Sequence, residues 1–99
     1  MFVEKRASEI FYRYHQFRRT DGDGWLGASE TISSCSVRII DSSNVNVSSS
    51  MVDNVTVYED TQVSYRLKGG TSGKTYIINI TVVTSESQTF EDSIKLKVL

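Results

Sequence analysis

Hydrophobic and polar residues alternate most regularly in the last third of the chain. Apolar residues recur on one face of two runs, residues 74–84 and residues 88–99, at Tyr76, Ile78, Ile80 and Val82 and then at Phe90, Ile94, Leu96 and Val98. A period of two predicts extended chain with one buried face. Because only residues 85–87 separate the two runs, we expect an antiparallel hairpin, and the rest of the chain must supply an opposing sheet.

Shorter alternating stretches precede this hairpin. They predict strands at residues 31–40, 45–47, 54–58 and 62–68, separated by turns that are rich in Asp, Ser and Asn. In the first of these strands Ile32 and Val37 would fall on opposite faces, which predicts a bulge or a break near residues 33–36.

The pattern in the first twenty residues is ambiguous. A helix would align an apolar stripe made of Val3, Ala7, Ile10, Tyr14 and Phe17. A strand would instead have two faces, one with Ile10, Tyr12 and Tyr14 and the other with Phe11, Arg13, His15 and Phe17. The density of aromatic residues favours a strand over residues 10–17, with residues 1–9 as a loose N-terminal tail.

About seven short strands, no proline and no internal helical pattern predict a single all-β domain over residues 1–99. Tyr76 follows a corner that contains Gly69, Gly70 and Gly73, residues that accept positive φ values. In immunoglobulin-like sandwiches a tyrosine at this place bonds its hydroxyl back to the preceding connection. We therefore expect an immunoglobulin-like antiparallel β-sandwich.

Composition limits the partners and the compartment. The formal net charge of −1 argues against a nucleic-acid binder, and no stretch is long and apolar enough to span a membrane. The first residues lack the apolar segment of a signal peptide, so the sequence does not predict secretion. Cys35 is the only cysteine, which rules out an internal disulfide, and Trp25 is expected to plug one end of the core.

No motif predicts catalysis, a cofactor or a metal site. Residues 21–24 begin like a calcium loop but lack the later oxygen ligands. Residues 69–75 end in Gly-Lys-Thr, but the first glycine of a phosphate loop is missing and a strand, not a helix, follows. His15 is the only histidine and no serine is marked as its nucleophile, so we expect no enzyme.

Basic and aromatic residues gather near the N-terminus. We expect a protein contact surface that comprises an exposed strand edge and the residues Phe11, Arg13, Phe17, Arg18 and Arg19. The alternative is a small module that binds carbohydrate or another cell-surface ligand through the exposed aromatic residues Trp25, Tyr58 and Tyr14.

Two stretches carry a family resemblance. The first is the aromatic strand that ends at Phe17, with Trp25, Leu26 and residues 29–32 after it, and the second is the corner 69–76 with the alternating positions that follow. They resemble a family of small phage and prophage proteins with an immunoglobulin-like sandwich fold, encoded among head–tail and tail structural genes. The resemblance implies a non-enzymatic structural or accessory virion protein that contacts other phage structural proteins. It implies no particular binding residues. We expect a monomer or weak oligomer, located in a virion or in the host cytoplasm.

Overall fold

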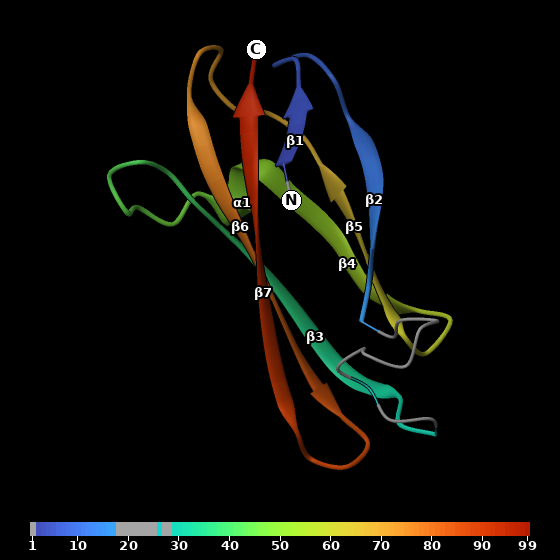
Figure 1. The fold of residues 1–99 in the computed structure, drawn as a ribbon. Helices are drawn as coiled ribbons and strands as arrows, with labels where there is room; N and C mark the ends of the chain where they lie inside the picture. Colours follow the sequence, from blue (N-terminus) through green and yellow to red (C-terminus); the bar gives the residue numbers. More distant parts are fainter. Residues whose placement is uncertain (1, 18–25, 27–28) are drawn as a thin grey trace.

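The computed structural model describes residues 2–17, 26 and 29–99, which form two β-sheets packed face to face (Figure 1). The strands are β1 (Phe2–Lys5), β2 (Phe11–Gln16), β3 (Ile32–Ile40), β4 (Val52–Tyr58), β5 (Gln62–Leu67), β6 (Thr75–Thr84) and β7 (Thr89–Val98). A single helical turn, α1 (Ser48–Met51), precedes β4. The four-stranded sheet has the order β1-β7-β6-β3, and the three-stranded sheet has the order β2-β5-β4. The predicted two-sheet, all-β architecture is confirmed at this level.

The predicted C-terminal hairpin is confirmed. Strands β6 and β7 pair without a register shift from Thr75 opposite Lys97 to Val83 opposite Thr89. The predicted apolar face points inward, and most of its residues are almost fully buried, namely Tyr76, Ile78, Ile80, Val82, Ile94, Leu96 and Val98. Burial of such side chains contributes about 1.5–3 kcal/mol each, so this hairpin forms one wall of the core.

The three-stranded sheet supplies the other wall. Val63, Tyr65 and Leu67 alternate along β5 and are all almost fully buried, as the period-two pattern of this segment predicts. Strand β5 lies between two neighbours, so its backbone groups are paired on both sides. The core therefore lies between the sheets, with β5 facing the hairpin.

The glycine-rich corner before β6 has the predicted geometry. The hydroxyl of Tyr76 accepts a hydrogen bond from the backbone N–H of Thr71 at 3.0 Å. Gly69, Gly70 and Gly73 have φ values of 60°, 93° and 86°. A Cβ atom at Gly70 would lie 2.8 Å from Cγ2 of Val98, so this position requires glycine for space as well as for conformation.

The prediction of a loose tail over residues 1–9 is wrong for residues 2–5. They form β1, which pairs with β7 in parallel, so the sandwich is not purely antiparallel. Val3 and Lys5 face inward and are 5% and 1% exposed. The ammonium group of Lys5 donates hydrogen bonds to the carbonyl oxygens of Arg6 and Gly69, both at 2.7 Å, and burial lowers the pKa of this group. Because a lysine stands at an inward position, residues 2–5 lack the apolar alternation that would predict a strand.

Two further segments bear on the predictions. Residues 11–16 form a strand, so the helical alternative is wrong, and the predicted irregularity in β3 appears as a register shift between Ile32 and Ser34. Residues 45–47 form no strand; Asn46 makes only an isolated bridge to Ile40. The hydroxyl of Ser48 accepts a hydrogen bond from the backbone N–H of Ile39 at 2.8 Å. A side chain thus satisfies a backbone group of β3 that a paired strand would otherwise satisfy. Trp25 lies outside the described residues.

Candidate contact surface

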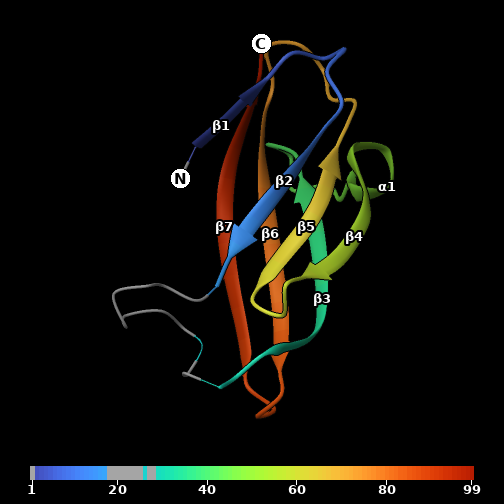
Figure 2. The same ribbon diagram turned by 90° about the vertical axis from the view of Figure 1, so that its right-hand side faces the viewer.

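The outer face of the three-stranded sheet carries exposed aromatic side chains (Figure 2 views this sheet from outside). Along β2 the side chains alternate between half-buried and exposed, and Tyr12 and Tyr14 are 49% and 52% exposed. Tyr58 at the end of β4 is 41% exposed. In the sheet register Tyr12 lies opposite Arg66, Tyr14 opposite Ser64 and Tyr58 opposite Gln62. All three tyrosines therefore lie on one face, which we call the tyrosine face (Tyr12, Tyr14 and Tyr58).

Two of these tyrosines are in direct contact through their rings. The ring centroids of Tyr14 and Tyr58 are 4.9 Å apart, and the ring planes are tilted by 59°. Ser64 of the central strand β5 points to the same face, yet it is only 5% exposed. Its neighbours in the sheet register are Tyr14 on β2 and Thr56 on β4. Tyr14 and Tyr58 thus form one contacting aromatic pair on the tyrosine face.

A fixed ion pair borders the tyrosine face. Nε and Nη2 of Arg66 donate to the two carboxylate oxygens of Asp53 at 2.7 and 2.6 Å, and Nζ of Lys68 lies 3.4 Å from the same carboxylate. The hydrogen bond from Arg66 holds the pKa of Asp53 below its usual value. The amide nitrogen of Asn54 donates to the hydroxyl of Tyr12 at 2.9 Å. The polar groups around the rings are therefore held in set positions.

Three of the residues predicted as a contact surface, Phe11, Arg13 and Phe17, do not belong to the tyrosine face. Phe17 is 2% exposed and belongs to the core, and Phe11 is half-buried and packs against it. Arg13 is also half-buried, on the same inward side of β2, next to Tyr65, whose pKa is raised by burial. The predicted surface is corrected accordingly, because the structure exposes the opposite face of β2. Arg18 and Arg19 lie outside the described residues.

A signal for the exposed face was present in the sequence. Both faces of β2 are aromatic, so hydrophobicity alone does not choose between them. However, the phenylalanines share one face and the tyrosines share the other. A phenylalanine has no polar group to leave in water, whereas a tyrosine carries a hydroxyl that favours a partly wet position.

The single histidine joins the two sheets. Nε2 of His15 on β2 lies 2.8 Å from Oδ2 of Asp92 on β7, and the two side chains are 10% and 38% exposed. The ring of His15 also meets that of Phe17 edge to face at 5.0 Å. Burial lowers the pKa of His15, and Asp92 opposes this shift. The contacts of this imidazole are those of a structural link.

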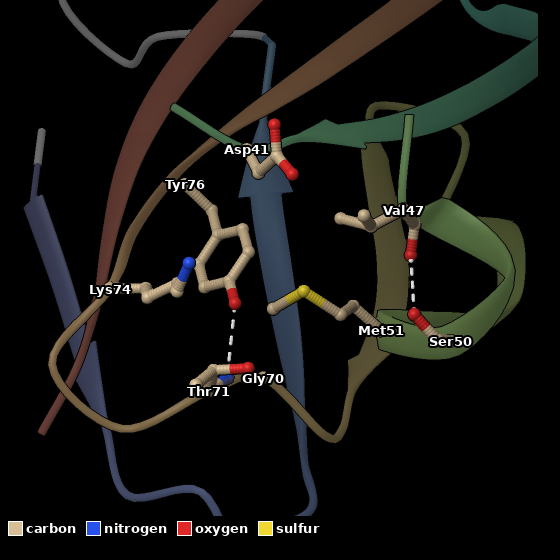
Figure 3. A pocket seen from close by; sticks show the side chains of 8 residues that line it. All are labelled: Asp41, Val47, Ser50, Met51, Gly70, Thr71, Lys74 and Tyr76. Atoms are coloured by element: carbon tan, nitrogen blue, oxygen red, sulfur yellow. Dashed lines mark hydrogen bonds between the residues drawn. The ribbon is translucent and has the colours of Figure 1, made fainter. Parts of the chain in front are cut away.

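A cavity of about 250 Å³ lies beneath the glycine-rich corner (Figure 3). It is lined by Asp41, Val47, Ser50, Met51, Gly70, Thr71, Lys74 and Tyr76. Several of its polar groups bond within the fold. The hydroxyl of Tyr76 is bonded to Thr71, that of Ser50 donates to the carbonyl of Val47 at 3.0 Å, and Asp41 accepts two backbone N–H groups of its own turn. The side chains of Tyr76, Ser50 and Asp41 are therefore engaged within the fold itself.

The described residues contain few side chains that are arranged to bind a metal or a phosphate or to act as a reactive thiol. Within them no three His, Cys, Asp or Glu side chains gather as a metal site. Cys35 is half-buried, and burial raises the pKa of its thiol. Residues 69–74 lead into strand β6 rather than a helix, which agrees with the exclusion of a phosphate loop. In the described part of the chain no helix is long and apolar enough to cross a membrane.

Fold and surface together define a small two-sheet structural domain whose distinctive feature is the exposed tyrosine face. The family model of podophage GP4 fiber-tail adaptor protein gp77 matches residues 15–97. The chain belongs to this family, which is a family of phage tail-associated structural proteins. The resemblance to phage structural proteins is thereby confirmed. No curated protein matches the chain.

Proposed function

We propose that the chain works as an adaptor in a phage tail and that it binds its neighbours through the tyrosine face. The observation that carries this proposal is the exposure of Tyr12, Tyr14 and Tyr58 on one side of a small domain. Tyrosine is enriched in protein interfaces because it offers a large contact area, a hydroxyl and few rotatable bonds. The family to which the chain belongs is described as a fiber-tail adaptor, a role that consists of such contacts.

The arrangement of the face supports this proposal. The rings of Tyr14 and Tyr58 are already in contact, so little side-chain freedom is lost when a partner covers them. The bidentate pair of Arg66 and Asp53 lies at the border of the face, where interfaces are polar. Other structural proteins of the virion are the partners that we propose.

We also propose that the fold is immunoglobulin-like. Strands β3, β6 and β7 share one sheet, and β2, β5 and β4 share the other, which matches the grouping of strands C, F, G and B, E, D in that fold. The tyrosine corner on β6 supports the same assignment. Strand β1 would then be strand A, paired with the last strand instead of with strand B.

Carbohydrate binding is the weaker alternative. A sugar ring stacks on a flat aromatic surface, but the rings of Tyr14 and Tyr58 are tilted by 59° and form no continuous platform. Trp25, the third aromatic residue of that alternative, lies outside the described residues. Contact with a protein explains the tilted and partly covered rings better than carbohydrate binding does.

The test is incorporation into virions. A phage that lacks this gene is complemented with the wild-type chain or with a variant that carries Tyr12→Ser, Tyr14→Ser and Tyr58→Ser. The control variant carries Arg38→Ser, Val83→Ser and Lys95→Ser, which are exposed positions on the outer face of the four-stranded sheet. Loss of an interface anchor costs 2 kcal/mol or more, so we expect incorporation of the tyrosine variant to fall at least about tenfold. The control variant should stay within about twofold of the wild type.

Circular dichroism and thermal melting of the purified variants show whether each one folds. A folded tyrosine variant that enters virions as well as the wild type would refute the proposal. If this variant enters virions but those virions fail to attach to host cells, the cell-surface alternative replaces it. If it does not fold, the single change Tyr12→Ser is tested in the same way, since that ring is not part of the tilted pair of Tyr14 and Tyr58.

A further inference from the structure

Strand β7 is longer than the strand that covers its outer edge. Strand β1 pairs with β7 only from Lys95 to Val98. Figures 1 and 2 both show β1 beside one end of β7 and not along its whole length. Among the described strands, none pairs with this edge over residues 89–94. We call this stretch the open edge of β7 (residues 89–94).

The hydrogen bonds at the two ends of the hairpin give the direction of the backbone groups. The N–H of Val98 donates to the carbonyl of Lys74, and the carbonyl of Gln88 accepts the N–H of Thr84. Even-numbered residues thus bond toward β6. Because bonds alternate sides along an antiparallel strand, the odd-numbered residues point their backbone groups away from β6. The bond from the N–H of Leu99 to the carbonyl of Lys5 on β1 agrees with this parity.

Thr89, Glu91 and Ser93 are the odd-numbered residues of the open edge. The N–H of Ser93 is occupied, since it donates to Oδ1 of Asp92 at 2.9 Å. The other carboxylate oxygen of Asp92 is held by His15. An inward-pointing charge on an edge strand is a known means of preventing unwanted pairing. Within the described residues no side chain accepts a bond from the N–H of Thr89 or Glu91, so the protection is local to Ser93.

We infer that the open edge of β7 binds an extended segment of a partner tail protein, which adds a strand in line with β1. This inference rests on the proposed adaptor function and names a second mode of contact beside the tyrosine face. Backbone bonds to Thr89 and Glu91 would supply the pairing. Six residues of strand span about 20 Å, which is enough for a segment with three inward side chains.

The side chains along the open edge indicate the chemistry of that segment. Phe90 and Ile94 face the inside of the sandwich on either side of Asp92, whereas Glu91 faces outward. Ile94 is already only 1% exposed and both carboxylate oxygens of Asp92 are engaged, so the exposed carboxylate of Glu91 sets the chemistry of the segment. A basic residue suits the outward position beside Glu91.

Proline at position 91 tests the inference, because it removes one backbone N–H that points away from β6 and leaves the hairpin bonds in place. Its matched control, Glu91→Ala, removes the side chain and keeps the N–H. In the virion complementation assay we expect Glu91→Pro to reduce incorporation about tenfold and Glu91→Ala to stay within about twofold of the wild type. Equal incorporation of the two variants would overturn the inference.

Amide hydrogen exchange of the wild-type chain provides a second measurement in case the proline variant does not fold. The amide of Glu91 should exchange more slowly in virions than in the isolated protein, and an unchanged rate would overturn the inference. The two proposals fail separately. If Glu91→Pro behaves like Glu91→Ala while the serine variant of the tyrosine face is excluded, only the edge is wrong. If the serine variant is incorporated normally and Glu91→Pro is not, the tyrosine face is wrong and the edge stands.

Discussion

The two outer faces of the sandwich differ in chemistry although both sheets enclose the same core. Apart from Val83, the outer face of the four-stranded sheet carries polar side chains at its exposed positions, among them Ser34, Ser36, Arg38, Glu91, Ser93, Lys95 and Lys97. The outer face of the three-stranded sheet carries the tyrosine face. Serine and lysine lose little by remaining in water, whereas exposed aromatic rings forgo burial. The comparison teaches that alternation sets which side of a strand is buried, while the chemistry of the outward residues shows which face is suited to a partner.

The largest effects should come from the shared core and should be alike on both sheets. Ile80 of the four-stranded sheet and Leu67 of the three-stranded sheet are both 0% exposed. Substitution of either by alanine should lower the free energy of unfolding by about 2–5 kcal/mol, measured by urea unfolding. The outer residue Val83, substituted in the same way, should change it by less than about 0.5 kcal/mol. A loss below about 1 kcal/mol for Leu67→Ala alone would show that the three-stranded sheet is not part of the same core.

The next effect concerns the corner that joins the two sheets. A Cβ atom at Gly70 would meet Val98 of one sheet at 2.8 Å and the Met51 side chain, just before β4, at 3.1 Å. At Gly73 a Cβ atom would meet nothing within 4 Å. Since both glycines have positive φ, Gly73→Ala should cost about 1 kcal/mol, and Gly70→Ala should cost about 1–2 kcal/mol more.

Thermal melting separates the two glycine variants, because each kcal/mol shifts the melting temperature of a domain of this size by about 4–8 °C. Equal shifts of the melting temperature would mean that the backbone at Gly70 moves enough to accommodate the added methyl group. The close approach of the two sheets would then not restrict the residue at this position.

The sequence predicted the regular parts of this fold for a physical reason. In β5, β6 and β7 one face is apolar and points into the core while the other is mostly polar, so the sequence itself shows a period of two. The corner was equally predictable, because a positive φ and a tyrosine hydroxyl each require particular residue types.

Other parts of the fold show no regular pattern in the sequence. Strand β1 depends on pairing with the far end of the chain, and its inward Lys5 is stabilised by backbone carbonyls rather than by a hydrophobic neighbour. In β2 both faces are aromatic, so the periodicity identified a strand but did not show that Tyr12 and Tyr14, rather than Phe11 and Phe17, are its exposed side chains. The open edge of β7 depends on where β1 ends, which no local pattern encodes.

A smaller effect is the coupling energy between neighbouring side chains, which should differ between the two outer faces. A double-mutant cycle with Tyr14→Ser and Tyr58→Ser should give a coupling energy of about 0.5–1.5 kcal/mol, since the rings are 4.9 Å apart. The equivalent cycle on the other face uses Thr81 and Glu91, whose side chains share an exposed hydrogen bond of 3.1 Å. We expect about 0.5 kcal/mol or less there. Equal coupling on both faces would contradict a tyrosine face that is ordered before a partner binds.

The smallest effect should appear where β2 meets β7, as a dependence of stability on pH. The pKa of His15 is lowered from its ordinary value of 6.5, chiefly by burial, so the unfolded chain takes up this proton at a higher pH than the folded chain does. The contribution of His15 to stability is therefore complete above pH 6.5 and is lost as the pH falls from there through the lower folded pKa. Urea unfolding between about pH 7.5 and about pH 5.5 measures it, and His15→Gln should flatten the profile in this range.

Asp92 sharpens the test because its carboxylate opposes the effect of burial on His15. With Asp92→Asn the pKa of His15 should fall further, and the loss of stability should extend to lower pH. A wild-type protein that becomes more stable between about pH 7.5 and about pH 5.5 would show that the carboxylate outweighs burial. The link between the sheets would then be an ion pair, and the open edge of β7 would be held more tightly in acid than at neutral pH.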